Sequence, residues 1–549
     1  MEVIQKETHL AHDAPGNIAL AVDAKNKLVG IVTDGDIRRA LLRGVDIDSP
    51  VHAILNRNPI TFRSSLSHEE ILAETVLKIS ERRITNKRLD VIITVDEHNR
   101  PYDVFPFFEL WRRTEVKTRV ISIVGLGFVG LTLGLVLAEV GFTVIGVDSN
   151  KKLVRDINKK KPHIHERGLS QLLDRHLNKT FFARTNFDNN DSDVYIICVG
   201  TPVDDRGAVQ TAPLALALSY ITNLLKPEDL VLLRSTVPVG TCRDIVIPIL
   251  EKKSSLRAGD DFYVAFVPER TVEGAAIEEL RTLPQIVGGL NKKSTDLAVK
   301  LFQYITNSIV LVDSLEEAEI IKLLNNAYRD LTFSFANEAA ILANAFGSSG
   351  HKVIAAANQG YPRSKIPQPS PGVGGYCLSK DPYIYAQSAK TLRVRTRLPL
   401  AARAVNGDML KHIVRDVDLF CKKQGKKNSA KIYLLGMAFK GTPETNDLRG
   451  STSVAIARTL SKKYKNVFVF DPVIDQKTLR AAGFKTLPIR AGFKDADCVL
   501  VLNNHASFKE LDIHRLTKTM RRPGLLFDGW SIFADSFTMA PRHLNYKVL

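Results

Sequence analysis

Cys377 stands in a setting suited to covalent chemistry. It follows two glycines, Gly374 and Gly375, in the segment SPGVGGYCLSKD. Lys380 and Asp381 come soon after it in the same segment. Glycines leave backbone amides and open space around a thiol, and a nearby cation would favour the thiolate, which is the nucleophilic form. A buried cysteine acting as a small apolar residue is the alternative, but glycine-rich polar loops do not build cores. We therefore expect Cys377 to be a nucleophile.

A second polar set lies within an apolar helical pattern. Lys322 and Asn326 are four residues apart in IIKLLNNAYRD, and Arg329 continues the same stripe. Residues at this spacing share one face of a helix, and polar side chains on that face need partners if they are buried. A solvated helix face is the alternative. The expected helix covers 315–346 and stops at Gly347. Its length of about 50 Å suits a connection between two domains or a dimer core.

The segment ISIVGLGFVGLTLGLVLAEVGFTVIGVD has the pattern of a dinucleotide-binding loop. Gly125, Gly127 and Gly130 form G-x-G-x-x-G between an expected strand and an expected helix. The first glycine permits the tight turn, the second lets a pyrophosphate approach the backbone, and the third lets helix and strand pack closely. The phosphates would meet the helix N-terminus, where Phe128 and Val129 lie.

Asp148 ends the second strand of this unit. An acid at that position accepts the ribose hydroxyls and repels a 2′-phosphate, so NAD is favoured over NADP. Lys151 and Lys152 follow directly and weaken the exclusion of NADP. We expect NAD as the cofactor.

These residues require a scaffold of alternating strands and helices. Candidate strands are VISIVG, TVIGVD, VYIICVG, LVLLRS and YVAFVP, and later AKIYLLG, VFVFDP, DCVLVLN and GLLFDG. Strands that alternate with helices indicate parallel doubly wound sheets. We expect an α/β protein with two Rossmann-like domains, at 119–312 and 429–549, joined by a long central helix within 313–420.

Residues 1–115 show a different, small α+β pattern. A strand–turn–strand–helix unit, IALAVD, AKNK, LVGIVT and a helix from Asp36, recurs in weaker form as DVIITVD, EHNR, PYDVFPF and FELWRR. Two such units resemble a pair of CBS motifs, which commonly form one adenosine-nucleotide-binding module. Thr33 and Asp36 match the ribose-contacting positions of that family, whereas the second unit has no equivalent. A purely structural or oligomerising module is the alternative, and the charged segment at 112–119 is the expected linker.

Five segments, including the two described above, are polar motifs in apolar or glycine-rich surroundings. Together, and in this order, they resemble the UDP-glucose/GDP-mannose dehydrogenase family over 119–535, and GVGGYCLSKD followed by AFKGTPETNDLRGS is highly specific. The CBS-like unit lies outside the usual family pattern. The five segments are STVPVGT (235–241), FVPERTVEG (266–274), IIKLLNNAYRD (320–330), SPGVGGYCLSKD (370–381) and GMAFKGTPETNDLRGS (436–451).

This resemblance implies a four-electron oxidation of a nucleotide sugar, with NAD and without a metal. The C6 alcohol is oxidised to an aldehyde, Cys377 adds to it as a thiohemiacetal, and a second oxidation leaves a thioester that water hydrolyses to the uronic acid. Lys322 and Asn326 would stabilise the oxyanion, and Glu269 and Asp381 would activate water. The implied catalytic residues are Cys377, Lys322, Asn326, Asp381, Glu269 and Thr236, of which Thr236 positions water.

The resemblance also implies the binding residues. Thr201 in VGTP and Arg449 would contact NAD, the latter at its phosphates, and Lys440 would reach the substrate diphosphate. Arg363 matches a residue that reaches into a neighbouring subunit's site, so a homodimer or larger homo-oligomer is expected. The implied substrate-binding residues are Glu273, Arg329, Arg363, Gly374 and Lys440.

The segments PER, NNAYRDLTFSFANE and QPSPGVGGYC are more similar to the N-acetylhexosamine branch of the family. The glucose branch usually has Phe where this chain has Arg270. We expect UDP-N-acetylmannosamine, UDP-N-acetylglucosamine or the galactosamine analogue, with a slight preference for the first two. Arg167 and the segment NNHASFK depart from the family pattern. The alternatives are a UDP-glucose 6-dehydrogenase and, from another class, a nucleotide-sensing protein with an inactive enzyme domain.

Composition sets outer limits on these functions. The 549 residues carry a net charge of +17, and 44% are hydrophobic. We interpret the charge as a basic surface that suits pyrophosphate ligands, with no nucleic-acid partner, and expect the run KKQGKKNSAK at 422–431 to be a solvated loop. Neither a signal peptide nor an apolar run of bilayer length is present, so we expect a cytoplasmic protein without a membrane partner. Scattered cysteines argue against disulfides and zinc; they are Cys198, Cys242, Cys377, Cys421 and Cys498.

Overall fold

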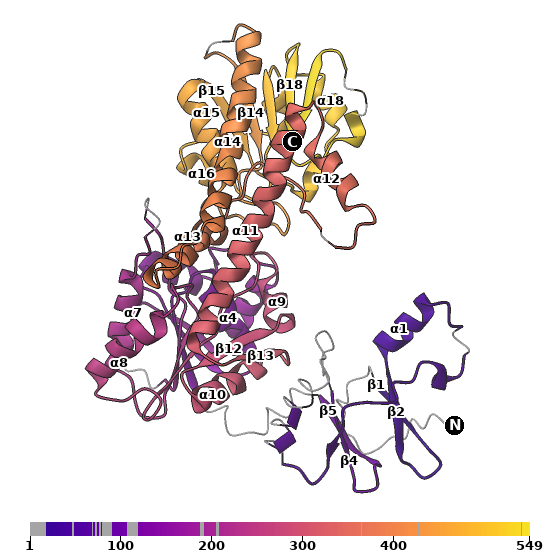
Figure 1. Cartoon of the computed structure of the whole chain (residues 1–549), viewed down its shortest axis with the longest axis vertical. Helices are drawn as coiled ribbons and strands as arrows, with labels where there is room; N and C mark the ends of the chain where they lie inside the picture. The colour runs from indigo at the N-terminus through magenta and orange to yellow at the C-terminus, as the bar shows by residue number, and fades with distance from the viewer. Residues whose placement is uncertain are drawn as a thin grey trace.

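A computed structural model gives the arrangement of the chain (Figure 1). Two α/β lobes follow each other along the sequence, and the long helix α11, Leu315–Ala345, runs from the first to the second. The described residues are 18–46, 49–67, 70–71, 74–75, 78, 91–106, 119–186, 192–204, 208–363, 365–426, 428–537, 539 and 541–549.

The first lobe contains an eight-stranded sheet in the order β13-β12-β11-β10-β9-β6-β7-β8. Neighbouring strands are parallel except for β11 and β12. The strand order reverses between β6 and β9, which is the switch point where doubly wound sheets bind ligands. The strands are β6 Val120–Val124, β7 Thr143–Val147, β8 Phe181–Arg184, β9 Val194–Ile197, β10 Leu230–Leu233, β11 Tyr263–Phe266, β12 Gln285–Gly289 and β13 Ile309–Val312.

All five strands expected in this lobe are confirmed, and β8, β12 and β13 were missed. The helices around the sheet are α4 Phe128–Glu139, α5 Lys151–Asn158, α6 Leu169–His176, α7 Ala212–Thr222, η3 Cys242–Val246, α8 Ile247–Ser254, α9 Ala276–Thr282 and α10 Lys292–Gln303. Helix α4 is apolar on all sides, and every residue from Gly130 to Ala138 is buried. This helix follows the glycine loop, so the loop stands on a rigid core.

The second lobe repeats the same strand order on a smaller scale. Its six-stranded sheet is parallel throughout, in the order β16-β15-β14-β17-β18-β19. The four expected strands are confirmed, and β16 and β19 were missed. The elements are β14 Lys431–Leu435, α15 Thr452–Lys463, β15 Asn466–Phe470, α16 Gln476–Ala481, β16 Lys485–Thr486, α17 Ile489–Phe493, β17 Cys498–Val501, η4 Ala506–Glu510, α18 Ile513–Thr517, β18 Gly524–Asp528, η5 Asp535–Phe537 and β19 Leu544–Val548.

Helices form the connection between the lobes. The expected helix at 315–346 is confirmed as α11, which begins where the side chain of Ser314 accepts a hydrogen bond from the amide of Glu317. It packs against α12 Gly350–Asn358, α13 Tyr376–Thr391 and α14 Leu398–Lys423. No helix among the described residues is long and apolar enough to cross a bilayer.

The N-terminal residues form two small sheets. The expected strand–turn–strand units are confirmed as two antiparallel hairpins, β1–β2 and β4–β5, and β3 joins the second hairpin in parallel. The expected helix FELWRR and positions 112–118 of the linker lie outside the described residues. The elements are β1 Ile18–Val22, β2 Leu28–Thr33, α1 Asp34–Leu42, η1 Val51–Ala53, β3 Phe62–Arg63, β4 Val91–Val95 and β5 Pro101–Pro106.

The basic run at 422–431 is only partly a loop, which corrects the expectation. Lys422 and Lys423 belong to the last turn of α14, where cations are favourable because they face the negative end of the helix. Lys431 lies in β14, and its Nζ donates to the carbonyl of Ala491 at 2.8 Å.

Candidate active site

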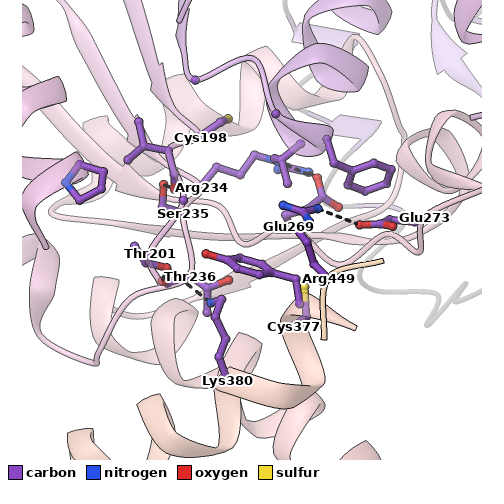
Figure 2. Close-up of a pocket in the computed structure, with 18 of the residues that line it drawn as sticks. Cys198, Thr201, Arg234, Ser235, Thr236, Glu269, Glu273, Cys377, Lys380 and Arg449 are labelled. Atoms are coloured by element: carbon purple, nitrogen blue, oxygen red, sulfur yellow. Dashed lines mark hydrogen bonds and ion pairs between the residues drawn. The ribbon is translucent and has the colours of Figure 1, made fainter. Parts of the chain in front are cut away.

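A cavity of about 500 Å³ opens at the carboxyl ends of β6 and β9, between the glycine loop, α11, α13 and the loop that follows β14 (Figure 2). It brings together residues from all five polar segments and from the glycine loop. The expected site residues along its wall are Gly125, Gly127, Phe128, Val129, Asp148, Thr201, Thr236, Glu269, Glu273, Lys322, Asn326, Arg329, Gly374, Cys377, Lys440 and Arg449.

The glycine loop is shaped for a pyrophosphate. Gly125 has a φ of +97°, which a side chain would strain. A Cβ on Gly130 would lie 1.8 Å from the carbonyl oxygen of Gly125, whereas one on Gly127 would meet nothing within 4 Å. Helix α4 has no side-chain cap at its N-terminus, so the amides of its first turn remain available to an anion. These features fit the phosphates of NAD.

Asp148 anchors this loop. Its Oδ2 accepts a hydrogen bond of 2.8 Å from the amide of Leu126, inside the glycine motif, and its Oδ1 accepts another of 2.8 Å from Asn150. Each carboxylate oxygen has a second lone pair, so the same group can still accept from ribose hydroxyls. The acid therefore links loop geometry to cofactor binding.

Cys377 lies in the first turn of α13 rather than in a loop, which corrects the expectation. The two preceding glycines do not leave open space. A Cβ on Gly374 would lie 2.7 Å from the carbonyl oxygen of Gly450, and a Cβ on Gly375 would lie 2.8 Å from the ring of Phe439. The glycines therefore let the loop after β14 approach the thiol closely.

The Cys377 thiol is exposed to the cavity, whereas the other four cysteines are buried. Burial within the cleft raises the pKa of this thiol, the carboxylate of Asp381 adds to the shift, and Lys322 and Lys380 offset it only in part. The two lysines therefore favour the thiolate, as expected of nearby cations, but burial and Asp381 outweigh them and keep the pKa of the thiol above its usual value.

Asp381 joins the two helices of the site. It is fully buried and accepts hydrogen bonds from Nδ2 of Asn326 at 2.6 Å and from Nζ of Lys380 at 2.8 Å. Lys380 also lies 3.5 Å from Oγ1 of Thr201 (Figure 2). Among the described residues, none forms a hydrogen bond or ion pair with Nζ of Lys322, so this buried ammonium faces the cavity unpaired.

Glu269 is held by an arginine that the sequence did not single out. Arg234, which is buried, donates to Oε2 of Glu269 at 2.7 Å, and the amide of Thr271 donates to Oε1 at 2.6 Å. Burial alone would raise the pKa of Glu269, but Arg234 and the Thr271 hydrogen bond together hold it below its usual value. Glu269 is therefore a fixed anion.

A second group of charges comes from the loop after β14. Nζ of Lys440 donates to the carbonyl of Glu273 at 2.5 Å, and burial lowers the pKa of this lysine to about 8. Arg449 pairs with Asp447 at 2.6 Å and lies 5.0 Å over the ring of Tyr376. Burial and Asp447 raise the pKa of Glu273. Two cations thus stand at the cavity edge formed by the second lobe.

Three expected site residues lie elsewhere. Arg363 is exposed, stacks on Tyr361 and does not line the cavity of its own chain. Thr33 and Asp36 form a reciprocal capping box at α1, with Oγ1 of Thr33 donating to Oδ2 of Asp36 at 2.7 Å. Their expected contact with an adenosine ribose stays a prediction.

Arg234 and Tyr376 were not singled out from the sequence. Arg234 pairs with Glu269 and Tyr376 lies under Arg449, and each contact joins two separate elements. The only sequence signal was an arginine at the end of an otherwise apolar strand, LVLLRS.

Comparisons with known proteins agree with this site. Three family models match in order: the NAD binding domain of the UDP-glucose/GDP-mannose dehydrogenase family over residues 119–306, its central domain over 316–408 and its UDP binding domain over 433–535. The chain belongs to the UDP-glucose/GDP-mannose dehydrogenase family. It is a nucleotide-sugar dehydrogenase that uses NAD, and its UDP binding domain indicates a UDP-sugar substrate.

Several relatives carry more specific names. The chain is 31% identical, over 76% of its length and 96% of the relative's, to a UDP-N-acetyl-D-mannosamine dehydrogenase of Pyrococcus horikoshii. It is 32% identical to an NDP-N-acetyl-D-galactosaminuronic acid dehydrogenase of Ralstonia solanacearum, over 74% and 95% of the two chains. The structure of UDP-D-ManNAc dehydrogenase from P. horikoshii matches with a TM-score of 0.71 and 30% identity, over 78% of this chain and 98% of the other.

Proposed function

We propose that this enzyme oxidises the C6 alcohol of a UDP-N-acetylhexosamine to the uronic acid, through a thiohemiacetal and a thioester on Cys377. The observation that carries this proposal is the setting of the thiol. Among the five cysteines, it alone is exposed, and it opens into the cavity that holds the glycine loop and the buried Lys322. NAD, when bound at the glycine loop, accepts the hydride in each of the two oxidations.

In the first stage the alcohol loses a hydride and its proton, and an aldehyde results. Lys322 and Asn326 lie on one face of α11 and line the cavity, so they stabilise negative charge on the C6 oxygen. Asp381 holds Asn326 in this orientation through the 2.6 Å hydrogen bond. The sulfur of Cys377 then bonds to the aldehyde carbon, the thiol proton leaves, and the carbonyl oxygen gains a proton, which gives the thiohemiacetal.

In the second stage the thiohemiacetal loses a hydride and a proton and becomes a thioester. Water adds to the thioester carbon, and the carbon–sulfur bond breaks to release the uronic acid and the Cys377 thiol. A carboxylate paired with Arg234 is a weak base. We therefore assign Glu269 and Thr236 to orienting this water, and assign the proton transfer to the Asp381 and Lys380 pair.

The N-acetylated sugar is supported by the names of the relatives and by Arg270. This residue follows Glu269 and lines both the main cavity and an adjoining space of about 250 Å³. Lys322, Asn325 and Arg329 share the wall of that second space. Guanidinium and amide donors suit the carbonyl oxygen of an N-acetyl group, whereas an apolar side chain at position 270 would not.

We also propose a homodimer built on α11. One face of this helix carries apolar side chains that are exposed in the single chain, including Ile320, Leu324, Tyr328 and Phe335. A contiguous apolar stripe of this kind marks an association surface. Sedimentation of the purified enzyme at micromolar concentration measures the assembly, and a monomer under these conditions would exclude it.

The test of the reaction is the number of NADH molecules formed per sugar consumed. A panel of UDP-hexoses and UDP-N-acetylhexosamines is offered with NAD, and two NADH per molecule of one N-acetylated sugar is expected. Cys377→Ser is expected to abolish net uronate formation, whereas Cys421→Ser, at a buried cysteine outside the cavity, serves as the matched control. Uronate formation by Cys377→Ser at the normal rate would overturn the covalent mechanism, and turnover of UDP-glucose alone would overturn the N-acetylated substrate.

A further inference from the structure

Helix α13 contains a proline in its interior, where proline removes a backbone hydrogen bond. Pro382 lies inside the helix, four residues after Leu378. In an α-helix the carbonyl of residue i accepts from the amide of residue i+4, and proline has no amide hydrogen. The carbonyl oxygen of Leu378 therefore lacks its helical donor. This carbonyl belongs to the residue directly after Cys377, so the missing hydrogen bond weakens the turn that carries the nucleophile.

Arg403 of α14 supplies a hydrogen-bond donor in place of the missing amide. Its Nη1 donates to the carbonyl oxygen of Leu378 at 3.2 Å. The same guanidinium donates to the carbonyl of Val373, from Nη2 at 3.4 Å and from Nη1 at 3.5 Å. Val373 and Leu378 flank the segment that contains Cys377. The Arg403 side chain thus links the residues on either side of the short segment that contains Cys377.

The guanidinium is itself fixed by a buried polar network. Nη1 of Arg403 donates to Oδ1 of Asp330 on α11 at 2.7 Å, and Asp330 is fully buried. Nδ2 of Asn406 also donates to this oxygen, at 2.8 Å. Asn337 accepts from the amide of Ser370 at 2.9 Å and donates to Asn406 at 2.9 Å, which anchors the start of the same loop. A network with few free rotations holds its donor in one position.

We infer that Arg403 is a positioning residue for the nucleophile, which replaces the amide that Pro382 removes and so fixes the first turn of α13 around Cys377. The inference rests on the proposed covalent function of Cys377. Arg403 contacts backbone carbonyls and does not line the cavity, so it acts through the placement of the thiol and not on the substrate. Its loss is expected to lower turnover more than substrate affinity.

The test uses the full chain and begins with one variant and its control. Arg403→Met removes both donors at similar side-chain length and is expected to lower kcat about a hundred-fold, which is typical of a displacement of about 1 Å at a reacting group. The KM for the nucleotide sugar is expected to stay nearly constant. NADH per sugar falls from two towards one, because the aldehyde escapes before the sulfur can add. Arg415→Met, on the same helix but exposed, is the matched control and is expected to behave as the wild type.

The decisive variant is Arg403→Met combined with Pro382→Ala. Alanine restores an amide hydrogen at position 382 for the Leu378 carbonyl, so most of the lost turnover is expected to return. A general packing defect would not be repaired in this way, and a double variant no more active than Arg403→Met would overturn the inference. Should Arg403→Met fail to fold, Arg403→Lys with and without Pro382→Ala gives the same comparison, because one ammonium cannot match the two-armed contact.

Alkylation of Cys377 by iodoacetamide, followed by mass spectrometry, separates this inference from the proposed function. The loosened turn in Arg403→Met lets water reach the thiol, so alkylation at neutral pH is expected to be faster, and to slow again in the double variant. If Cys377→Ser keeps full activity while these alkylation changes occur, the covalent mechanism fails and the positioning role stands. An unchanged alkylation rate in Arg403→Met would overturn the positioning role alone.

Discussion

Nδ2 of Asn326 lies 2.6 Å from Oδ2 of Asp381, and this hydrogen bond fastens the long helix α11 to the helix that carries Cys377. Both side chains are buried, so the contact is not weakened by water. The face of α11 that carries Lys322 and Asn326 and the turn of α13 that carries Cys377 consequently keep one relative position.

Asp381→Asn is expected to change turnover and thiol reactivity in opposite directions. The carboxylate of Asp381 raises the pKa of Cys377, so its neutralisation lowers that pKa and increases the thiolate fraction at neutral pH. Turnover falls, because the variant loses the group that pairs with Lys380. The pH profile of iodoacetamide alkylation measures the first effect and NADH formation the second. A profile shifted to higher pH would contradict the electrostatic role of Asp381.

The glycine motif provides a matched pair of substitutions. Gly130→Ala places a Cβ 1.8 Å from a backbone oxygen, so helix α4 must shift and stability falls by about 1–3 kcal/mol. Gly127→Ala meets no atom within 4 Å, so the fold is expected to keep its melting temperature. The added methyl group instead obstructs the approach of the pyrophosphate, and calorimetry should show weakened NAD binding. Normal NAD affinity in Gly127→Ala would place the cofactor elsewhere.

We expect Lys440 to limit activity on the alkaline side. Burial lowers its pKa to about 8, so the lysine loses its charge as the pH rises through this value. We expect Lys440 to contact the substrate diphosphate, which a neutral amine attracts less, so kcat/KM for the nucleotide sugar is expected to fall above about pH 8. Lys440→Arg keeps its charge at all these pH values and should remove this limb of the profile. A limb that persists in the arginine variant would assign it to another group.

We expect Glu319 to make the fold less stable as the pH rises. It accepts hydrogen bonds from the amides of Gly240 at 2.5 Å and Cys242 at 2.9 Å, yet burial raises its pKa from 4.5 to about 7. Between these pH values the folded chain keeps a proton that the unfolded chain releases, so stability falls with rising pH, by about 3 kcal/mol in total. Glu319→Gln has no such titration, and its melting temperature should decline less between pH 4.5 and 7. Parallel declines in both proteins would show that Glu319 does not titrate there.

The sequence alone determined the features that depend on neighbours along the chain. Nine strands of the two sheets were predicted from continuous apolar runs, and α11 from its helical spacing, because these patterns follow the geometry of one element. The dinucleotide-binding motif at Gly125 was predicted for the same reason, because its strand, loop and helix and Asp148 follow one another along the chain. The short strands β8 and β16 lack such a pattern, and they are strands because neighbouring strands offer hydrogen bonds. Strands β12 and β13 do have an apolar run followed by a glycine or an acid, and they were missed all the same.

The tertiary structure decided what each chemical group can do. Glu269 and Arg234 are 35 positions apart, and Asn326 and Asp381 are 55 apart, so no local pattern reports either contact. The sequence indicated that a lysine near Cys377 favours the thiolate, and it does, but the net pKa of that thiol also depends on how much water the surrounding helices exclude. The sequence therefore determines which reactive residues are present and in what order they occur. Their protonation and orientation depend on desolvation and on distant partners, which exist only once the lobes have packed.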